Sequence, residues 1–233
     1  MLNVLEKYDA VTNEQNNSLE NAMHIAAVNN MDKFIEKYLI YENQPDSRIY
    51  KCQCECEDSV RTPSVQVLNN KFLTPLLLAV MKGNLKAIKS LANDKNTKIE
   101  AKDINGNSVY QICAEFNYVN CFHYFLKNHF DNSPKFLLSA NNKEETVLHT
   151  ACRFGNIEIV NLVYEKVNES NLNLEKFLYA KNDLGQTCFH VSCITGFLNI
   201  IEYFLKDLKK ISFVDQIDIS SNTPLHLATF NGK

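Results

Sequence analysis

Three cysteines at alternate positions, Cys52, Cys54 and Cys56, form the cluster in this sequence that is best suited to carry chemistry. Alternate residues of an extended strand point the same way, so these thiols could bind a soft metal ion or exchange disulfides. A structural zinc site needs four ligands, however, and the segment contains no fourth cysteine or histidine. Acidic neighbours, Glu55 and Glu57, also disfavour the reactive thiolate. We favour an exposed loop without a site, and keep a redox-reactive patch and a metal site as alternatives.

Catalytic groupings are missing from the rest of the sequence. His123 and His129 have no cysteine, serine or carboxylate at a spacing that suggests a catalytic triad. The glycines form no phosphate-binding motif. We therefore expect no catalytic residues, no cofactor and no enzymatic activity.

The element that organises the chain is a short phrase that returns six times, at intervals of 53, 34, 38, 41 and 36 residues. This spacing is close to the period of about 33 residues that is typical of units made of a turn and two short helices. The six copies are Asn21-Ala-Met-His24, Thr74-Pro-Leu-Leu77, Ser108-Val-Tyr-Gln111, Thr146-Val-Leu-His149, Thr187-Cys-Phe-His190 and Thr223-Pro-Leu-His226.

Each phrase is followed by the same pattern of side chains. Small residues stand five and six places after its start, as in Ala151 and Cys152, and would let neighbouring helices pack closely. A residue that tolerates positive φ, such as Gly155, stands nine places on and can end a helix. A second apolar run with helical spacing then begins, as in Ile159-Val160.

These residues resemble the ankyrin repeat, whose motif is T-P-L-H-x-A followed by a turn and a second helix. The resemblance implies an all-α solenoid of about six helix-turn-helix units with hairpin linkers. It also implies that the histidines of the phrase hydrogen-bond the backbone of neighbouring turns rather than bind metal. These are His24, His149, His190 and His226.

The predicted organisation is a lead-in segment followed by one repeat array. The lead-in covers residues 1–17 and the array residues 18–233, with a long insertion at 41–70 that contains the cysteine cluster. The expected units lie near 18–40, 71–95, 105–130, 143–167, 184–210 and 220–233, the last of them incomplete.

Composition and charge narrow the class of protein further. The chain has 233 residues, of which 45% are hydrophobic and 22% charged, as in soluble globular proteins. A formal net charge of −3 argues against nucleic acid or an anionic membrane as the main partner. The sequence contains no apolar run of about 20 residues and no signal peptide. We expect a cytoplasmic location, with cysteines of the repeats buried as small apolar side chains.

Protein binding is the expected function, because the resemblance implies a surface that binds partners and no catalytic centre. In ankyrin arrays the places seven and eight residues after the phrase start are candidate contacts, and aromatic and arginine side chains there are typical of binding hot spots. An alternative is that Phe116 and Phe154 pack on the following turn. The candidates are Met81, Lys82, Glu115, Phe116, Arg153, Phe154, Ile194 and Phe230.

The sequence ends after the first helix of the sixth unit, which leads us to expect a fragment of a longer protein. The long, irregular units, such as the segment from Lys176 to Thr187, resemble the N-terminal cytosolic array of TRPA-type transient receptor potential cation channels. The partner would then be another protein or another part of the same longer chain. Two alternatives are a free-standing soluble adaptor and a thiol- or metal-responsive module acting through the cysteine cluster.

Overall fold

The computed structural model describes residues 14–43, 63–130, 135–207 and 214–233. Within these ranges the chain forms twelve α-helices and one short 3-10 helix, and no strand. The all-α fold class expected from the sequence is confirmed. Two compact units, Met1–Ile104 and Asn105–Lys233, divide the chain and are described separately.

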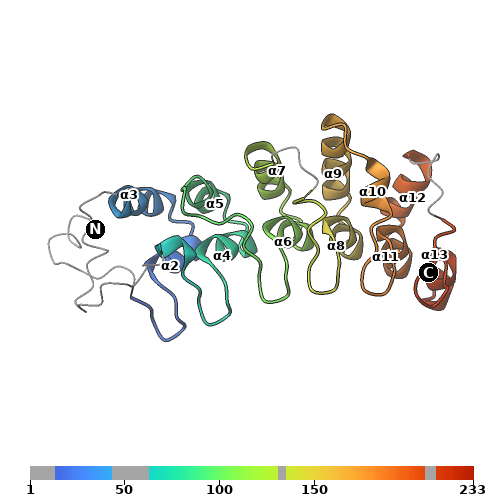
Figure 1. The fold of residues 1–233 in the computed structure, drawn as a ribbon, viewed down its shortest axis with the longest axis horizontal. Coiled ribbons are helices and arrows are strands. Elements are labelled where there is room, and N and C mark those ends of the chain that lie inside the picture. Colours follow the sequence, from blue (N-terminus) through green and yellow to red (C-terminus); the bar gives the residue numbers. More distant parts are fainter. Residues whose placement is uncertain (1–13, 44–62, 131–134, 208–213) are drawn as a thin grey trace. The chain divides into compact units, whose positions relative to one another are not determined.

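The first unit contains two helix pairs. The first helices of the two pairs, α2 and α4, pack on each other, as do the second helices, α3 and α5 (Figure 1). A short 3-10 helix, η2, precedes the second pair and contacts α4. The bounds are α2 Ala22–Val28, α3 Asp32–Glu42, η2 Ser64–Gln66, α4 Pro75–Met81 and α5 Leu85–Ala92.

The second unit repeats this arrangement over four units of sequence. The first helices stack in the order α6, α8, α11 and α13, and the second helices in the order α7, α9 and α12. A short extra helix, α10, packs on α9. The bounds are α6 Val109–Glu115, α7 Val119–Asn128, α8 Val147–Phe154, α9 Ile157–Glu169, α10 Leu174–Leu178, α11 Cys188–Thr195, α12 Leu198–Asp207 and α13 Pro224–Phe230.

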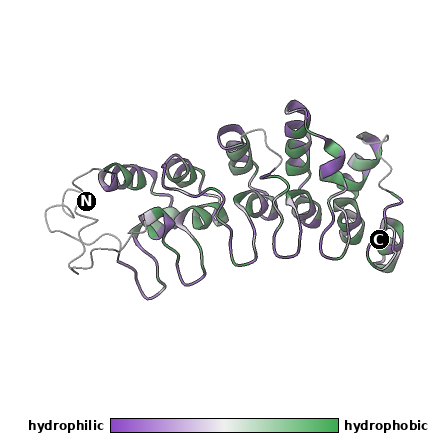
Figure 2. Ribbon diagram, viewed as in Figure 1, coloured by the Kyte–Doolittle hydropathy of each residue, from purple (hydrophilic) through white to green (hydrophobic). Residues whose placement is uncertain are grey.

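Small side chains form the contact between successive first helices. Ala151 and Cys152 of α8 are fully buried, and Ser192 and Cys193 take the same places in α11. The second helices are amphipathic and carry hydrophilic residues on their outer sides (Figure 2). As predicted, the described cysteines are free and buried.

Hairpin loops join the repeats, and in several of them one asparagine or aspartate side chain accepts hydrogen bonds from the backbone of the loop. In the loop before α8, Asn141 Oδ1 accepts hydrogen bonds from the backbone N–H groups of Lys143 and Glu145, at 2.9 and 3.0 Å. Neighbouring hairpins are joined through their backbones, since the N–H of Asp183 donates to the carbonyl of Lys143 at 3.1 Å. In the same way, the N–H of Ile219 donates to the carbonyl of Leu184 in the preceding hairpin at 3.1 Å.

In α2, α6 and α8 the third helical residue links one repeat to the next. His149 Nδ1 accepts from the backbone N–H of Thr146 at 3.2 Å, and its Nε2 lies 2.9 Å from the carbonyl oxygen of Gln186 in the following hairpin. Because an N–H can only donate and a carbonyl can only accept, the imidazole must be neutral with its proton on Nε2. His24 makes the corresponding contact with the carbonyl of Leu73 at 3.0 Å. The expected structural role of these two histidines is confirmed.

Other side chains at the same place show what the link requires. Gln111 reproduces it with its amide: Oε1 accepts from the N–H of Ser108 at 3.0 Å and Nε2 donates to the carbonyl of Glu145 at 2.6 Å. Leu77 has no polar side-chain atom and can make neither bond. His190 keeps the bond to Thr187, but its buried Nε2 has no hydrogen-bond partner among the described residues.

Gln111 and Leu77 stand at the place equivalent to His149 in other repeats, and they indicate how substitutions of His149 should behave. We expect His149→Gln to keep both hydrogen bonds and to change the free energy of unfolding little. His149→Leu should lower it by about 1–3 kcal/mol, because the buried carbonyl of Gln186 loses its donor. Urea unfolding followed by circular dichroism measures both values, and equal losses in the two variants would contradict this role.

The buried histidines should make the free energy of unfolding depend on pH. Burial lowers the pKa of His24, His149 and His190 from the ordinary value of 6.5, so the unfolded chain binds more protons below that pH. Their contribution to stability is complete above about pH 6.5 and is lost as the pH falls below it. We expect a lower urea midpoint at pH 5.5 than at pH 7.5, with a smaller difference in the His149→Gln variant. A pH dependence unchanged by that substitution would count against the assignment.

Candidate functional site

The eight predicted contact residues lie at the C-terminal ends of the first helices, next to the turn that follows each of these helices. Three of them are phenylalanines with a large exposed fraction: 45% for Phe116, 44% for Phe154 and 89% for Phe230. Lys82, the residue that follows α4, is also exposed. The others, Met81, Glu115, Arg153 and Ile194, are half-buried.

Arg153 has an intramolecular partner. Its guanidinium forms an ion pair with the carboxylate of Glu145, whose side chain is only 6% exposed. The arginine therefore compensates a buried negative charge at the base of the preceding hairpin. Its own side chain is 39% exposed to solvent. Removing Arg153 would leave Glu145 buried without its cation, so a loss of binding in such a variant could not be separated from a loss of stability.

The turns of adjacent repeats touch one another, so their side chains form one continuous surface in the second unit. Phe197 lies over Gly155, where an added Cβ atom would be 2.7 Å from the ring. One repeat further, the side-chain stem of Lys233 covers Gly196 in the same way. On the other side, Asn156 Nδ2 donates to the carbonyl of Ala114 in α6.

Phe197 is the contact residue that the sequence prediction missed. It stands ten places after the start of its phrase, outside the two places we considered, and 38% of it is exposed. With it, each of the four repeats of the second unit presents one exposed phenylalanine at its turn. We call the set Phe116, Phe154, Phe197 and Phe230 the turn ridge.

Part of the turn ridge also packs on the protein itself. The ring of Phe116 stacks on that of Tyr118, with ring centres 5.7 Å apart and planes inclined by 21°. This contact agrees with the alternative that Phe116 packs against the following turn. Packing on one side fixes the rings while their other side faces solvent.

Part of the chain matches a known protein family. A family model described as ankyrin repeats, in three copies, matches residues 76–176. This segment is similar to ankyrin repeats. The comparison with curated proteins finds no match. Ankyrin repeats are in general protein-interaction modules rather than catalysts, so the match indicates a protein partner.

The cysteine cluster of Cys52, Cys54 and Cys56 lies outside the described residues. The residues that flank this segment are held together: the buried carboxylate of Glu42 accepts from the N–H and the hydroxyl of Ser64, at 2.9 and 2.6 Å. Within the described part of the chain, no three histidine, cysteine or acidic side chains lie together as metal ligands.

The described cysteines are in environments that suppress reactivity. Burial raises the pKa of Cys113 and Cys152 well above the ordinary value and that of Cys193 to about 11. At neutral pH these side chains are therefore thiols rather than thiolates, and thiolate is the nucleophile.

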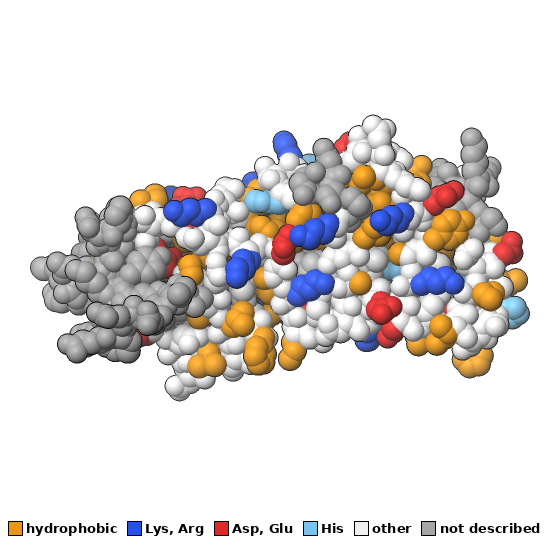
Figure 3. All heavy atoms as spheres, in the orientation of Figure 1, with side chains coloured by type: hydrophobic (Ala, Val, Ile, Leu, Met, Phe, Trp, Pro, Cys, Tyr) orange, Lys and Arg blue, Asp and Glu red, His pale blue; other side chains and the backbone are white. Residues whose placement is uncertain are grey.

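Hydrophobic side chains reach the surface in several separate places, interleaved with lysine and arginine side chains (Figure 3). Among the described residues, no helix is both long and apolar enough to cross a membrane.

Thiol reactivity can be predicted from this burial. In a variant with Cys52, Cys54 and Cys56 replaced by serine, five cysteines remain, and all five are buried. We expect almost no reaction with 5,5′-dithiobis(2-nitrobenzoic acid) in the native state and reaction of all five after denaturation in guanidinium. Rapid reaction of the native variant would show that the repeats themselves hold an accessible thiol.

Proposed function

We propose that the second unit binds a protein partner through the turn ridge. One observation carries the proposal: four successive repeats each expose a phenylalanine at the same turn, with 38–89% of the residue in solvent. Repeat proteins bind extended partners through surfaces to which each stacked unit contributes side chains.

The chemistry of the ridge favours a protein over a small ligand. Aromatic side chains bury a large area for little conformational entropy and are typical anchors of protein interfaces. The ridge is a row of separate rings on a surface, whereas small molecules are bound in concave pockets that enclose them. A partner segment with apolar side chains at intervals that match the repeats would cover the four rings in succession.

Contacts behind the rings make this surface ready to bind. Phe197 is held over Gly155, and Phe116 is held against Tyr118. Side chains that are already ordered lose less conformational entropy when a partner covers them, which favours affinity.

The experiment compares a ridge variant with a matched control in the same unit. Phe116→Ser with Phe154→Ser removes two rings that are each about half exposed, and Leu205→Ser removes a side chain of 46% exposure from α12. Proximity labelling in cells, with each protein fused to the same labelling enzyme, identifies the neighbours of each. We expect the wild type and Leu205→Ser to share neighbours that the ridge variant loses.

Circular dichroism and urea unfolding must show that the ridge variant remains folded. Loss of an interface hot spot costs about 2 kcal/mol or more in binding free energy, equivalent to at least about a 30-fold weaker complex. Identical neighbours for the wild type and the ridge variant would contradict the proposal.

The wider setting of the chain rests on sequence resemblance alone. A TRPA-type channel predicts several apolar stretches of about 20 residues in the gene beyond Lys233, whereas a soluble adaptor predicts none. The thiol- or metal-responsive alternative places its chemistry at Cys52, Cys54 and Cys56, outside the described residues, and stays a prediction. Reading the gene beyond Lys233 distinguishes the first two.

A further inference from the structure

Two first helices expose apolar side chains at places that are buried in the other repeats. The residue two places after the phrase start is 0–5% exposed in the first five repeats, whereas Leu225 of α13 is 72% exposed. The residue four places after the start is 0–8% exposed in repeats two to five, whereas Ile25 of α2 is 42% exposed. Within the described residues no repeat follows α13 and none precedes α2. The first place therefore faces a following repeat and the second place a preceding one.

The exposed face of α13 also carries two hydrogen-bonding groups without partners. His226 Nδ1 accepts from the backbone N–H at the start of its own phrase at 3.2 Å, which leaves the proton of the neutral ring on Nε2. Among the described residues no group accepts from this Nε2, the atom through which His149 binds the next hairpin. The carbonyl of Ser220 has no partner there either, whereas the corresponding carbonyl of Leu184 accepts from the N–H of Ile219 at 3.1 Å.

The hairpin before α2 offers the complementary groups. The carbonyl of Glu20 accepts one backbone N–H, from Asn16 at 2.9 Å. The corresponding carbonyl of Gln186 accepts one N–H of its own hairpin and also binds the Nε2 of a histidine, so Glu20 has a lone pair left for the same bond. The N–H of Asn17 stands where Ile219 donates to the preceding hairpin, and it has no partner within the described part of the chain.

Apolar end faces are not what a repeat stack in water favours. Stacked repeats bury a continuous core, and terminal repeats that stay in solvent need a polar outer face. The faces of α13 and α2 are instead the two halves of the contact that joins successive repeats inside the chain. The packing of α13 on α11 shows that a first helix and its hairpin are sufficient for such a contact.

We propose that a second copy of this chain stacks on the first, with α2 of one molecule against α13 of the other. His226 Nε2 donates to the carbonyl of Glu20, and the N–H of Asn17 donates to the carbonyl of Ser220. The exposed apolar side chains of both faces are buried between the two helices. The interface that joins the repeats thus continues from one molecule to the next.

The contact is heterologous, because it joins two different faces. Each molecule that has bound a neighbour through α13 still has its α2 face free for another. Contacts of this type build rings or open filaments, whereas a contact between identical faces stops at a dimer. The mass of the assembly should therefore grow with protein concentration.

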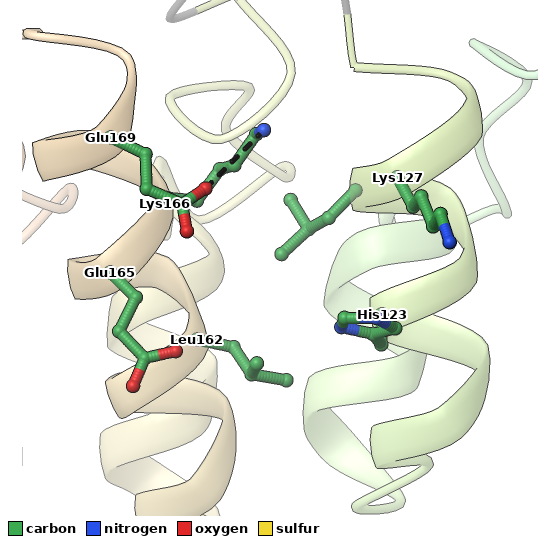
Figure 4. A pocket seen from close by; sticks show the side chains of 7 residues that line it. His123, Lys127, Leu162, Glu165, Lys166 and Glu169 are labelled. Atoms are coloured by element: carbon green, nitrogen blue, oxygen red, sulfur yellow. Dashed lines mark ion pairs between the residues drawn. The ribbon is translucent and has the colours of Figure 1, made fainter.

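This association should be weak, because one part of the usual contact between repeats is missing. Where complete repeats stack, the second helices also face each other: Leu162 of α9 points towards α7, where Leu126 is 5% exposed (Figure 4). No second helix follows α13 within the described residues. The interface should thus be smaller than the roughly 800 Å² per partner of a stable complex, and the assembly should appear only at high protein concentration.

Sedimentation velocity of the full 233-residue chain tests this contact. We expect the weight-average sedimentation coefficient of the wild type to rise as the concentration is raised from micromolar to submillimolar. Ile25→Lys and Leu225→Lys each place a charge on one face and should stay monomeric. The matched control is Ile40→Lys, which changes a 67% exposed residue of α3 in the groove beside α5 and should associate like the wild type. Circular dichroism checks that every variant is folded.

Mixing the two face variants tests the geometry of the contact. Ile25→Lys keeps an intact α13 face, and Leu225→Lys keeps an intact α2 face. Their mixture should form a one-to-one complex, although each variant alone stays monomeric. A contact between two identical faces predicts no such recovery.

Substitutions of His226 test the hydrogen bond. His226→Gln should associate like the wild type, because Gln111 makes the corresponding bond inside the chain. His226→Leu loses the donor and should associate about fivefold more weakly, as expected for one net hydrogen bond.

The proposal is overturned if the wild type stays monomeric at every concentration, or if either face variant associates as the wild type does. It is also overturned if the mixture of the two face variants stays monomeric. The ridge variant Phe116→Ser with Phe154→Ser should assemble like the wild type, so this proposal and that of the turn ridge can fail independently.

Discussion

A hydrogen-bonded link between a side chain of one repeat and the backbone of the next recurs at α2, α6 and α8, and the geometry of these repeats depends on it. The third residue of the first helix accepts from the N–H at the start of its own helix and donates to the carbonyl that precedes the next repeat. Both backbone groups lie at buried positions, where an unmade hydrogen bond is costly. A single neutral side chain thus fixes the helix start, the hairpin and the spacing of repeats.

Two side chains with different chemistry can make this link, and for the same reason. Imidazole and carboxamide each offer a donor and an acceptor on opposite sides of a planar group, and His149 and Gln111 use them alike. Where the side chain is Leu77 the link is impossible, and the helix start relies on the hydroxyl of Thr74, which accepts from the N–H of Leu77 at 3.3 Å. Within each unit, backbone hydrogen bonds between neighbouring hairpins provide a second connection that does not depend on side chains, as between Asp183 and Lys143.

Features set by local spacing could be predicted from the sequence, and those set by long-range contacts could not. The all-α class, the buried cysteines and the histidine links all follow from a pattern that repeats along the chain. The partner of Arg153 did not, because its ion pair with Glu145 depends on how the hairpin returns to the helix. The hydrogen bond from Ser64 to Glu42 joins residues on either side of the long insertion, and no local sequence pattern indicates it. Phe197 was missed because the prediction considered two places in the turn and the ridge uses three.

The turns show how the packing of successive repeats leads to an exposed aromatic side chain. The carbonyls at the end of a first helix need hydrogen-bond donors, and the next repeat supplies some of them. Where the helix ends before Asn30 or Asn117, an asparagine of the following turn donates to its last carbonyls, as Asn84 does to Ala27 and Val28 at 2.8 Å.

At the end of α8 the Thr195 hydroxyl of the next repeat donates to the carbonyl of Cys152 at 3.4 Å. The helix ends at Gly155, which is in the left-handed region, and the Phe197 ring lies over this glycine. A ring that covers a glycine is only half enclosed, because the turn is at the edge of the stack. Its inner face packs on the glycine, and its outer face is exposed to solvent. The exposed Phe197 ring is therefore a consequence of how α8 ends, and a substitution there must be judged for stability before it is judged for binding.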